Sequence, residues 1–235
     1  MGRFFRFMLG VAALPFAWSL ARVFVDVVQQ VPGRDALLPP GLVAMFVGMA
    51  VYVATAILLP TPVRVYVLGH ELTHALCGLI FGARVSNLKV GVRGGSVMVS
   101  KSNVWITLSP YFVPFYTVVV TIAAIVVRCC AGHLPYPPAW FFAVGFTWSF
   151  HFVFTVRSLL QEQPDVQEYG YVFSYVLIWI FNVAGAAVWI GCMADVPWKF
   201  LGADVFNRAC QSYSAVAACC VSLYEHLRSL SFLQG

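Results

Sequence analysis

The sequence predicts an all-α polytopic membrane protein with about six transmembrane helices and one membrane-associated β-hairpin. Three observations favour this fold class. The 235 residues are 61% hydrophobic and only 10% charged, whereas soluble domains carry about 25% charged residues. The apolar residues gather in runs of about 20, the length that spans the hydrocarbon core of a bilayer. One polar stretch between two such runs alternates with period two, which is typical of a β-hairpin.

The first expected span is Phe7–Val28, and the basic residues Arg3 and Arg6 precede it. A positively charged start before an apolar run also resembles a secretory signal peptide. No cleavage site of small residues follows the run. We therefore expect a retained first helix, with a removed signal peptide as the alternative.

Proline and glycine mark the limits of the other apolar runs. Pro60 separates the second run from the third, Gly82 ends the third, and Pro110 and Pro114 interrupt the fourth, because these residues break helices. A polar interruption at Gln161–Gly170 precedes the last run. The five further expected spans are Leu42–Leu59, Val63–Phe81, Val104–Val127, Ala139–Leu160 and Tyr171–Met193.

The polar stretch Val85–Ser102 lies between the third and fourth runs. Apolar and polar residues alternate in it on both sides of Gly94-Gly95. Period-two alternation on either side of a glycine pair predicts two antiparallel strands. The alternative is an ordinary polar loop.

The end of the chain differs in composition from the rest. We expect residues 1–194 to form the transmembrane domain and residues 195–235 to form a C-terminal tail. Within the tail, Val205–Leu230 is mixed in polarity. This stretch is a candidate amphipathic helix that lies on the membrane surface.

Charge and cysteine usage exclude two classes of protein. The net charge is only +5 and there is no basic run, so we expect the lipid bilayer as a partner and no nucleic acid. The seven cysteines form no C-x-x-C pair. Several lie within apolar runs, where cysteine behaves as a small hydrophobic residue rather than as half of a disulfide.

The most informative motif is His70–His74, with the sequence His-Glu-Leu-Thr-His, inside the third apolar run. The spacing puts both imidazoles on one face of a helix, where they can bind one metal ion. Glu71 can then take a proton from a water molecule bound to the metal. Ionisable groups in an apolar segment are costly and mark function. The alternative is a satisfied polar cluster between packed helices.

The motif and the Gly94-Gly95 hairpin together resemble the site-2 protease class of intramembrane zinc metalloproteases, the M50 peptidase family. The chain is most similar to the compact bacterial M50B-like members, roughly from Val63 to Asn182. The resemblance implies that residues 1–194 are a metalloprotease-like domain with a Zn²⁺ cofactor. It also implies membrane-protein substrates and a multi-pass location in the bacterial inner membrane.

The family has a third zinc ligand, an aspartate, at the edge of a later transmembrane helix. Asp165 occupies the matching place, although Val166 follows it where the common family form has glycine. The other carboxylates near it, Glu162 and Glu168, are further candidates. His151, in the fifth run, is either an auxiliary polar group near the metal or a histidine that packs between helices.

The expected enzyme is a zinc metalloendopeptidase that cleaves membrane proteins in or near their transmembrane segments. His70, His74 and Asp165 would hold Zn²⁺, and Glu71 would act as the general base. A substrate helix must unwind before cleavage, and an added strand at a hairpin edge would supply replacement hydrogen bonds. The strands around Gly94 and Gly95 are therefore expected to present the substrate.

Two rival functions use the same residues. One is a catalytically inactive M50-like membrane scaffold that keeps the fold. The other is a metal transporter in which the ligands form a transit site. A transporter would carry several polar relay sites along its path, whereas this sequence has one compact cluster, and that counts against transport. The sequence does not separate the scaffold from the enzyme.

Overall fold

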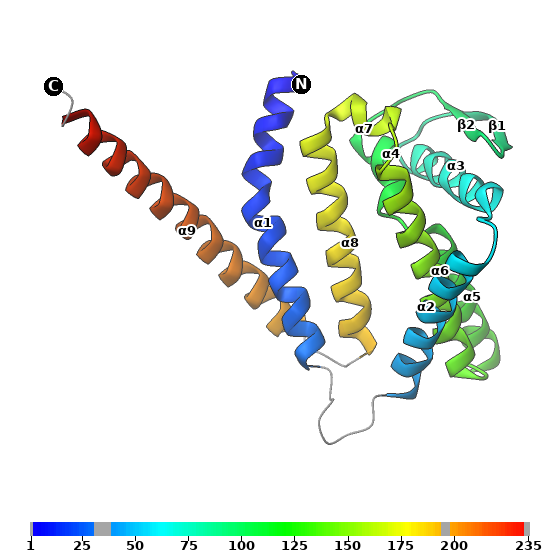
Figure 1. Ribbon diagram of the computed structural model, residues 1–235. Coiled ribbons are helices and arrows are strands. Elements are labelled where there is room, and N and C mark those ends of the chain that lie inside the picture. The colour runs from blue at the N-terminus through cyan, green and yellow to red at the C-terminus, as the bar shows by residue number, and fades with distance from the viewer. Residues whose placement is uncertain (1, 31–38, 194–197, 233–235) are drawn as a thin grey trace.

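A computed structural model of the chain describes residues 2–30, 39–193 and 198–232. These residues are mostly helical, with one two-stranded sheet (Figure 1). The elements in chain order are α1 (Arg3–Gln30), α2 (Pro40–Leu58), α3 (Val63–Ile80), β1 (Val85–Gly91), β2 (Gly94–Val99), α4 (Val104–Leu108), the 3-10 turn η1 (Ser109–Tyr111), α5 (Phe115–Ala131), α6 (Pro137–Leu159), α7 (Pro164–Tyr169), α8 (Tyr171–Met193) and α9 (Trp198–Phe232).

Four of the described helices are long and apolar enough to cross a membrane, namely α1, α2, α6 and α8. A fifth span is possible if α4 and η1 are taken together with α5, although the two parts are bent by 84°. The described residues are therefore those of a helical membrane protein with four or five candidate spans. The sequence analysis expected about six.

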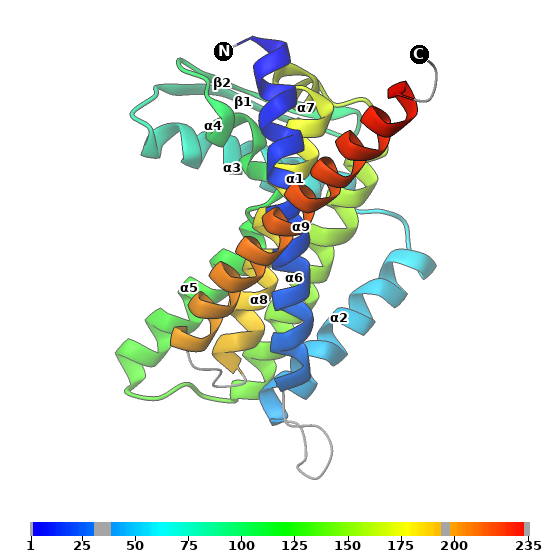
Figure 2. The same ribbon diagram turned by 90° about the vertical axis from the view of Figure 1, so that its left-hand side faces the viewer.

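One expected span that is not among the candidates is α3, which the sequence analysis expected at Val63–Phe81; the bent pair of α4 with η1 and α5 accounts for the remaining difference. Among the described helices, α3 does not belong to the group suited to crossing a membrane. It lies across one end of the bundle rather than alongside the other helices (Figures 1 and 2). Arg64 and the ionisable groups of His70–His74 interrupt its apolar sequence. Such groups lower the free energy gained by inserting a helix into lipid.

Helices α2 and α6 pack closely because each carries a glycine that faces the backbone of the other helix. A Cβ atom at Gly48 would overlap the carbonyl oxygen of Phe142, and one at Gly145 would overlap that of Met45. Small residues at such crossings let two helices approach within van der Waals contact, the main source of helix association in lipid. This packing fixes α6, whose carboxyl end forms part of the site described below.

The stretch Val85–Ser102 contains a hairpin, as predicted. Strands β1 and β2 pair antiparallel, with Val85 opposite Val99 and Gly91 opposite Gly94. The turn itself consists of Val92 and Arg93, two residues before the position that the alternation suggested. Gly94 has a φ of 134°, which L side chains rarely adopt, so glycine is needed where the second strand begins. The hairpin packs on α3.

The fourth expected span, Val104–Val127, is broken in the structure. The segment formed by α4 and η1 ends at Tyr111, and α5 starts at Phe115 in a different direction. The two prolines at positions 110 and 114 account for the break, because proline lacks the backbone donor that a continuous helix needs. The Asn103 side chain caps α4 by accepting from two backbone N–H groups. The broken end lies beside α3 and α7 (Figure 1).

The tail forms one long helix, α9, which covers the predicted stretch Val205–Leu230. Its first half contacts α1, where Arg208 pairs with Asp26 and Tyr213 donates to the Ala12 carbonyl. Its second half diverges from the bundle (Figure 1). A position of α9 on the membrane surface stays a prediction. The expected domain boundary at residues 194 and 195 lies outside the described residues.

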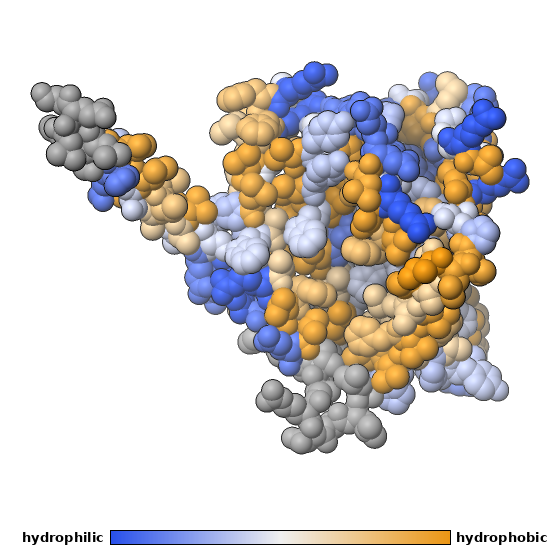
Figure 3. Space-filling model, viewed as in Figure 1, coloured by the Kyte–Doolittle hydropathy of each residue, from blue (hydrophilic) through white to orange (hydrophobic). Residues whose placement is uncertain are grey.

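The surface divides by polarity along the bundle. Apolar side chains cover much of the flanks of the helices, whereas hydrophilic residues gather around the end that carries α3, α7 and the hairpin, and in a second area beside the start of α9 (Figure 3). Exposed apolar side chains occur on every candidate span, for example Leu14, Val47, Phe152 and Trp179. Such flanks suit contact with lipid, which replaces water around a membrane protein.

Candidate metal centre

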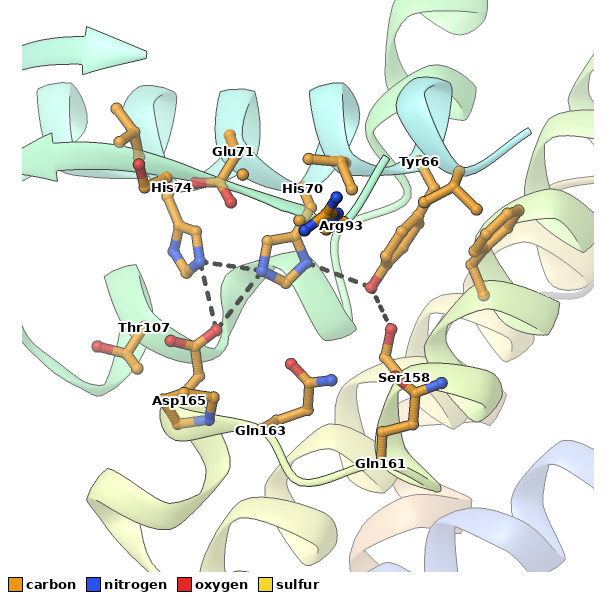
Figure 4. Close-up of a pocket in the computed structure, with 18 of the residues that line it drawn as sticks. Tyr66, His70, Glu71, His74, Arg93, Thr107, Ser158, Gln161, Gln163 and Asp165 are labelled. Atoms are coloured by element: carbon orange, nitrogen blue, oxygen red, sulfur yellow. Dashed lines mark hydrogen bonds and ion pairs between the residues drawn. The ribbon is translucent and has the colours of Figure 1, made fainter. Parts of the chain in front are cut away.

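Helix α3 brings the two motif histidines together. His70 and His74 are one turn apart, and their Nε2 atoms lie 3.2 Å from each other. Both imidazoles are mostly buried, with 13% and 12% of the side chain exposed. The spacing of four residues makes this meeting a local property of the helix. Two histidine nitrogens thus face one point at the wall of a cavity (Figure 4).

Asp165 approaches the two histidines from a distant part of the chain. It is the second residue of the short helix α7, directly after Pro164. Its Oδ2 lies 3.5 Å from His70 Nε2 and 3.4 Å from His74 Nε2. Within the described residues, these three side chains form the one group of His, Cys, Asp or Glu that could hold a metal ion.

The electrostatic setting keeps Asp165 in its charged form. Burial by itself raises the pKa of a carboxyl group. The contacts with His70 and His74 outweigh that effect and hold the pKa of Asp165 below its usual range. Asp165 therefore offers an anionic oxygen, the form in which a carboxylate binds metals.

Each of the three groups also has an outer contact. The Nδ1–H of His74 donates to the Ile106 carbonyl oxygen at 2.8 Å. The Tyr66 hydroxyl lies 3.3 Å from His70 Nδ1, and the Tyr111 hydroxyl donates to Asp165 Oδ2 at 3.1 Å. Contacts of this kind fix the tautomer and orientation of metal ligands. With Nδ1 engaged, Nε2 of each imidazole is left to bind an ion.

Glu71 lies beside the group but is not a member of it. The residue is 8% exposed and packs against β2. A Cβ atom at Gly95 would come within 2.8 Å of Glu71 Cγ and within 2.5 Å of Val67 Cγ1. Glycine at position 95 thus allows the hairpin to lie directly on Glu71.

The group opens into a cavity of about 920 Å³. Helix α3, strand β2, the carboxyl end of α6 and the loop into α7 form its walls (Figure 4). Much of the lining is polar, including Arg93 of the hairpin turn and Arg157 of α6. A space of this size and polarity is large enough to hold water beside the group.

The other predicted candidates lie outside the group. Glu162 and Glu168 line the cavity but do not reach the histidines. His151 is buried in α6, and its Nε2 has no hydrogen-bond partner in the described part of the chain. It faces a separate cavity of about 20 Å³ behind His70. Among the candidates, the structure therefore brings only Asp165 to the two motif histidines.

Sequence reasoning did not identify the tyrosines of the site. Tyr66 is four residues before His70, on the same face of α3, so helical spacing could have suggested it. It also bonds to Ser158 of α6 at 2.6 Å. Tyr111 follows Pro110 in a broken span and has no spacing that relates it to Asp165. Its role depends on the three-dimensional arrangement alone.

Comparison with known proteins yields no relative: no family model, curated protein or solved structure matches the chain. The class of this protein is therefore defined by its fold and its site alone. The described part of the chain is a helical bundle with four or five candidate membrane spans. At its polar end, two histidines and an aspartate form a candidate metal centre beside a glutamate and a cavity.

Proposed function

We propose that the protein is an intramembrane zinc-dependent endopeptidase that hydrolyses peptide bonds in or near the transmembrane segments of membrane proteins. The observation that carries the proposal is the meeting of His70, His74 and Asp165 beside a cavity that Glu71 also lines. Metal ligands, a base and space for a substrate are thereby combined in one place. This is the arrangement that metal-assisted hydrolysis requires.

The separations within the group fit zinc. Tetrahedral zinc with Zn–N and Zn–O bonds of usual length holds its ligand atoms about 3.3–3.5 Å from one another. The three separations are 3.2, 3.4 and 3.5 Å. Two imidazoles and one carboxylate also leave a fourth position open, as in catalytic zinc sites. The donor set and its spacing thus favour Zn²⁺ over the hard cations Mg²⁺ and Ca²⁺, which prefer oxygen ligands.

The residues of the site have separate roles in the proposed reaction. When bound, Zn²⁺ would supply Lewis acidity that activates water and polarises the scissile carbonyl. Glu71 takes the proton from the water molecule that adds to the carbonyl carbon. It then passes that proton to the leaving nitrogen as the C–N bond breaks. One water molecule is consumed for each peptide bond, and an acid and an amine are released.

Strand β2 is the candidate surface for substrate pairing. In the described two-stranded sheet, β1 occupies one edge of β2 and leaves the other without a neighbouring strand. Residues 94–97 of β2 line the cavity. An unwound substrate segment that adds to this edge would recover the backbone hydrogen bonds of its former helix. Gly94 and Gly95 lie in this part of the strand, where the sequence analysis expected substrate presentation.

Two rival functions make different predictions. An inactive scaffold with the same fold would hold the metal and cleave nothing. A transporter would need further ligand groups along a path, but the described residues contain one such group. The large polar cavity beside Glu71 favours the enzyme, because a scaffold has no need of a base next to its ligands.

The test combines metal analysis with a cleavage assay. We expect detergent-purified protein to contain about one zinc per chain and to cleave some members of a panel of single-span membrane proteins. Removal of the metal with a chelator should stop cleavage, and added Zn²⁺ should restore it. Protein that holds zinc and cleaves nothing in the panel would favour the scaffold, and protein without zinc would exclude the proposed metal centre.

The hairpin leads to a separate prediction. Gly95→Ala should lower cleavage by about 10–100-fold, because displacing a catalytic group by about 1 Å can cost a factor of that size. The added Cβ atom would push β2 away from Glu71 and Val67. Zinc content should stay unchanged, since Gly95 touches no ligand. Ser96→Ala on the same strand serves as the matched control. Normal cleavage by Gly95→Ala would mean that close approach of the hairpin is unnecessary.

A further inference from the structure

Tyr111 is the most deeply buried large side chain at the candidate metal centre. It is the last residue of η1, at the break between α4 and α5, and its exposed fraction is 0%. The hydroxyl donates to Asp165 Oδ2 at 3.1 Å and also lies 3.3 Å from Gln163 Oε1. The ring packs edge-on against the His70 imidazole, with 5.3 Å between ring centroids. Tyr111 thus contacts two of the three candidate ligands.

We propose that Tyr111 is a positioning residue that holds the Asp165 carboxylate in the orientation needed for metal binding. This inference rests on the proposed metal centre and adds to it a residue outside the ligand set. Tyr111 would act through Asp165, without contact to the substrate.

The contact is made to the oxygen that faces the histidines. Asp165 Oδ2 is the atom within 3.5 Å of both imidazole Nε2 atoms, and Tyr111 donates to this same atom. A carboxylate oxygen has two lone-pair directions. With one taken by the phenol, the other remains for an ion. The hydrogen bond therefore selects Oδ2 as the ligand atom and opposes rotation of the carboxylate toward two-oxygen binding.

Tyr111 is itself held firmly. The Asn182 side chain in α8 donates to the Tyr111 backbone carbonyl at 2.9 Å. Leu108, Val166 and Ile178, all buried, pack around the ring in one apolar cluster. A hydroxyl on a rigid, enclosed ring loses little conformational entropy when it forms its hydrogen bond, so it can fix a partner more strongly than a mobile side chain.

The broken span gives the same segment a second contact with the site. Ile106, in α4, accepts a hydrogen bond from His74 Nδ1, and the Ser109 hydroxyl donates to the same carbonyl oxygen. Residues 104–111 thus hold one histidine through a backbone carbonyl and the aspartate through a phenol. Pro110 lies four residues after Ile106 and has no backbone N–H, so it cannot donate to the Ile106 carbonyl oxygen as a helix residue would. That oxygen is thereby left to accept from His74.

The test removes only the hydroxyl. Tyr111→Phe keeps the ring, so the variant should fold. Its zinc affinity should be about 10–100-fold weaker, or its release of zinc to a competing chelator correspondingly faster, which is the usual cost of losing an outer contact to a metal ligand. The visible absorption of the Co²⁺-substituted protein should also change, because it reports coordination. Tyr116→Phe is the matched control, since the Tyr116 hydroxyl donates to the Val65 carbonyl and touches no ligand.

A double variant separates positioning from a general structural effect. Alanine at position 165 leaves no acceptor for Tyr111. If Tyr111 acts through Asp165, then Tyr111→Phe combined with Asp165→Ala should retain zinc no worse than Asp165→Ala alone. Additive losses would overturn the proposal, as would wild-type zinc retention and an unchanged Co²⁺ spectrum in Tyr111→Phe. Either of these results would overturn only the role of Tyr111, and the proposed function would stand as long as wild-type protein binds zinc. Absence of zinc from wild-type protein would instead overturn the metal centre and this inference together.

Discussion

Glu71→Gln is expected to lower the rate of peptide cleavage by about 10²–10⁴-fold, the usual contribution of a general base. Zinc content should remain at the wild-type level, because Glu71 is outside the ligand group. The substitution changes the chemistry with little change in shape. The measurement is initial cleavage rate at equal zinc occupancy.

The control for this variant is Glu168→Gln, which also replaces a carboxylate that lines the cavity. It should cleave at close to the wild-type rate. Wild-type activity in Glu71→Gln would mean that another group acts as the base. A loss of zinc along with activity would mean that Glu71 contributes to the metal centre itself.

Asp165→Asn should remove most of the zinc and abolish cleavage. We expect metal affinity to fall by more than about 100-fold. Loss of a residue that only contacts a ligand costs up to about 100-fold, and loss of a ligand should cost more. An amide oxygen carries no net charge, so it binds zinc far more weakly than a carboxylate. The variant keeps the volume of the side chain and an acceptor for Tyr111, which limits the change in fold. Elemental analysis and chelator competition on purified protein measure the effect.

Glu162→Gln is the matched control for Asp165→Asn, because Glu162 lies in the loop just before α7 and lines the cavity without joining the ligand group. It should keep its zinc. The assignment of Asp165 is wrong if Asp165→Asn retains full zinc while His151→Ala loses it. That pattern would make His151 the third ligand, despite its position behind His70.

Local patterns in the sequence predicted the parts of the site that lie close together in the chain. The i, i+4 spacing of His70 and His74 placed both on one face of a helix, as the structure has them. Alternation in Val85–Ser102 predicted the hairpin, which is confirmed. Its turn was placed wrongly, because the glycine pair begins the second strand with a positive φ at Gly94 instead of forming the loop.

Contacts between distant segments could not be read from spacing. Tyr111 and Asp165 are 54 residues apart, and their meeting depends on the bend between η1 and α5. The expectation for Asp165 came from resemblance and not from periodicity. The expected span at Val63–Phe81 rested on the length of the apolar run. Arg64, His70, Glu71 and His74 lower the mean hydropathy of that run, and α3 does not fall among the candidate spans.

The position of α3 at the polar end of the bundle has a consequence for where a substrate would be cut. With the bilayer around the apolar flanks, this polar end would lie next to the aqueous phase, and water would reach it without a long passage through lipid. The last turn of any α-helix already leaves four carbonyl groups without intrahelical partners, so it frays at little cost. A target helix would therefore need to release only its terminal residues to enter the cavity. Under the proposed function, the scissile bond would therefore lie where the target emerges from the bilayer, and extending the target's apolar stretch by one turn should shift the bond out of reach.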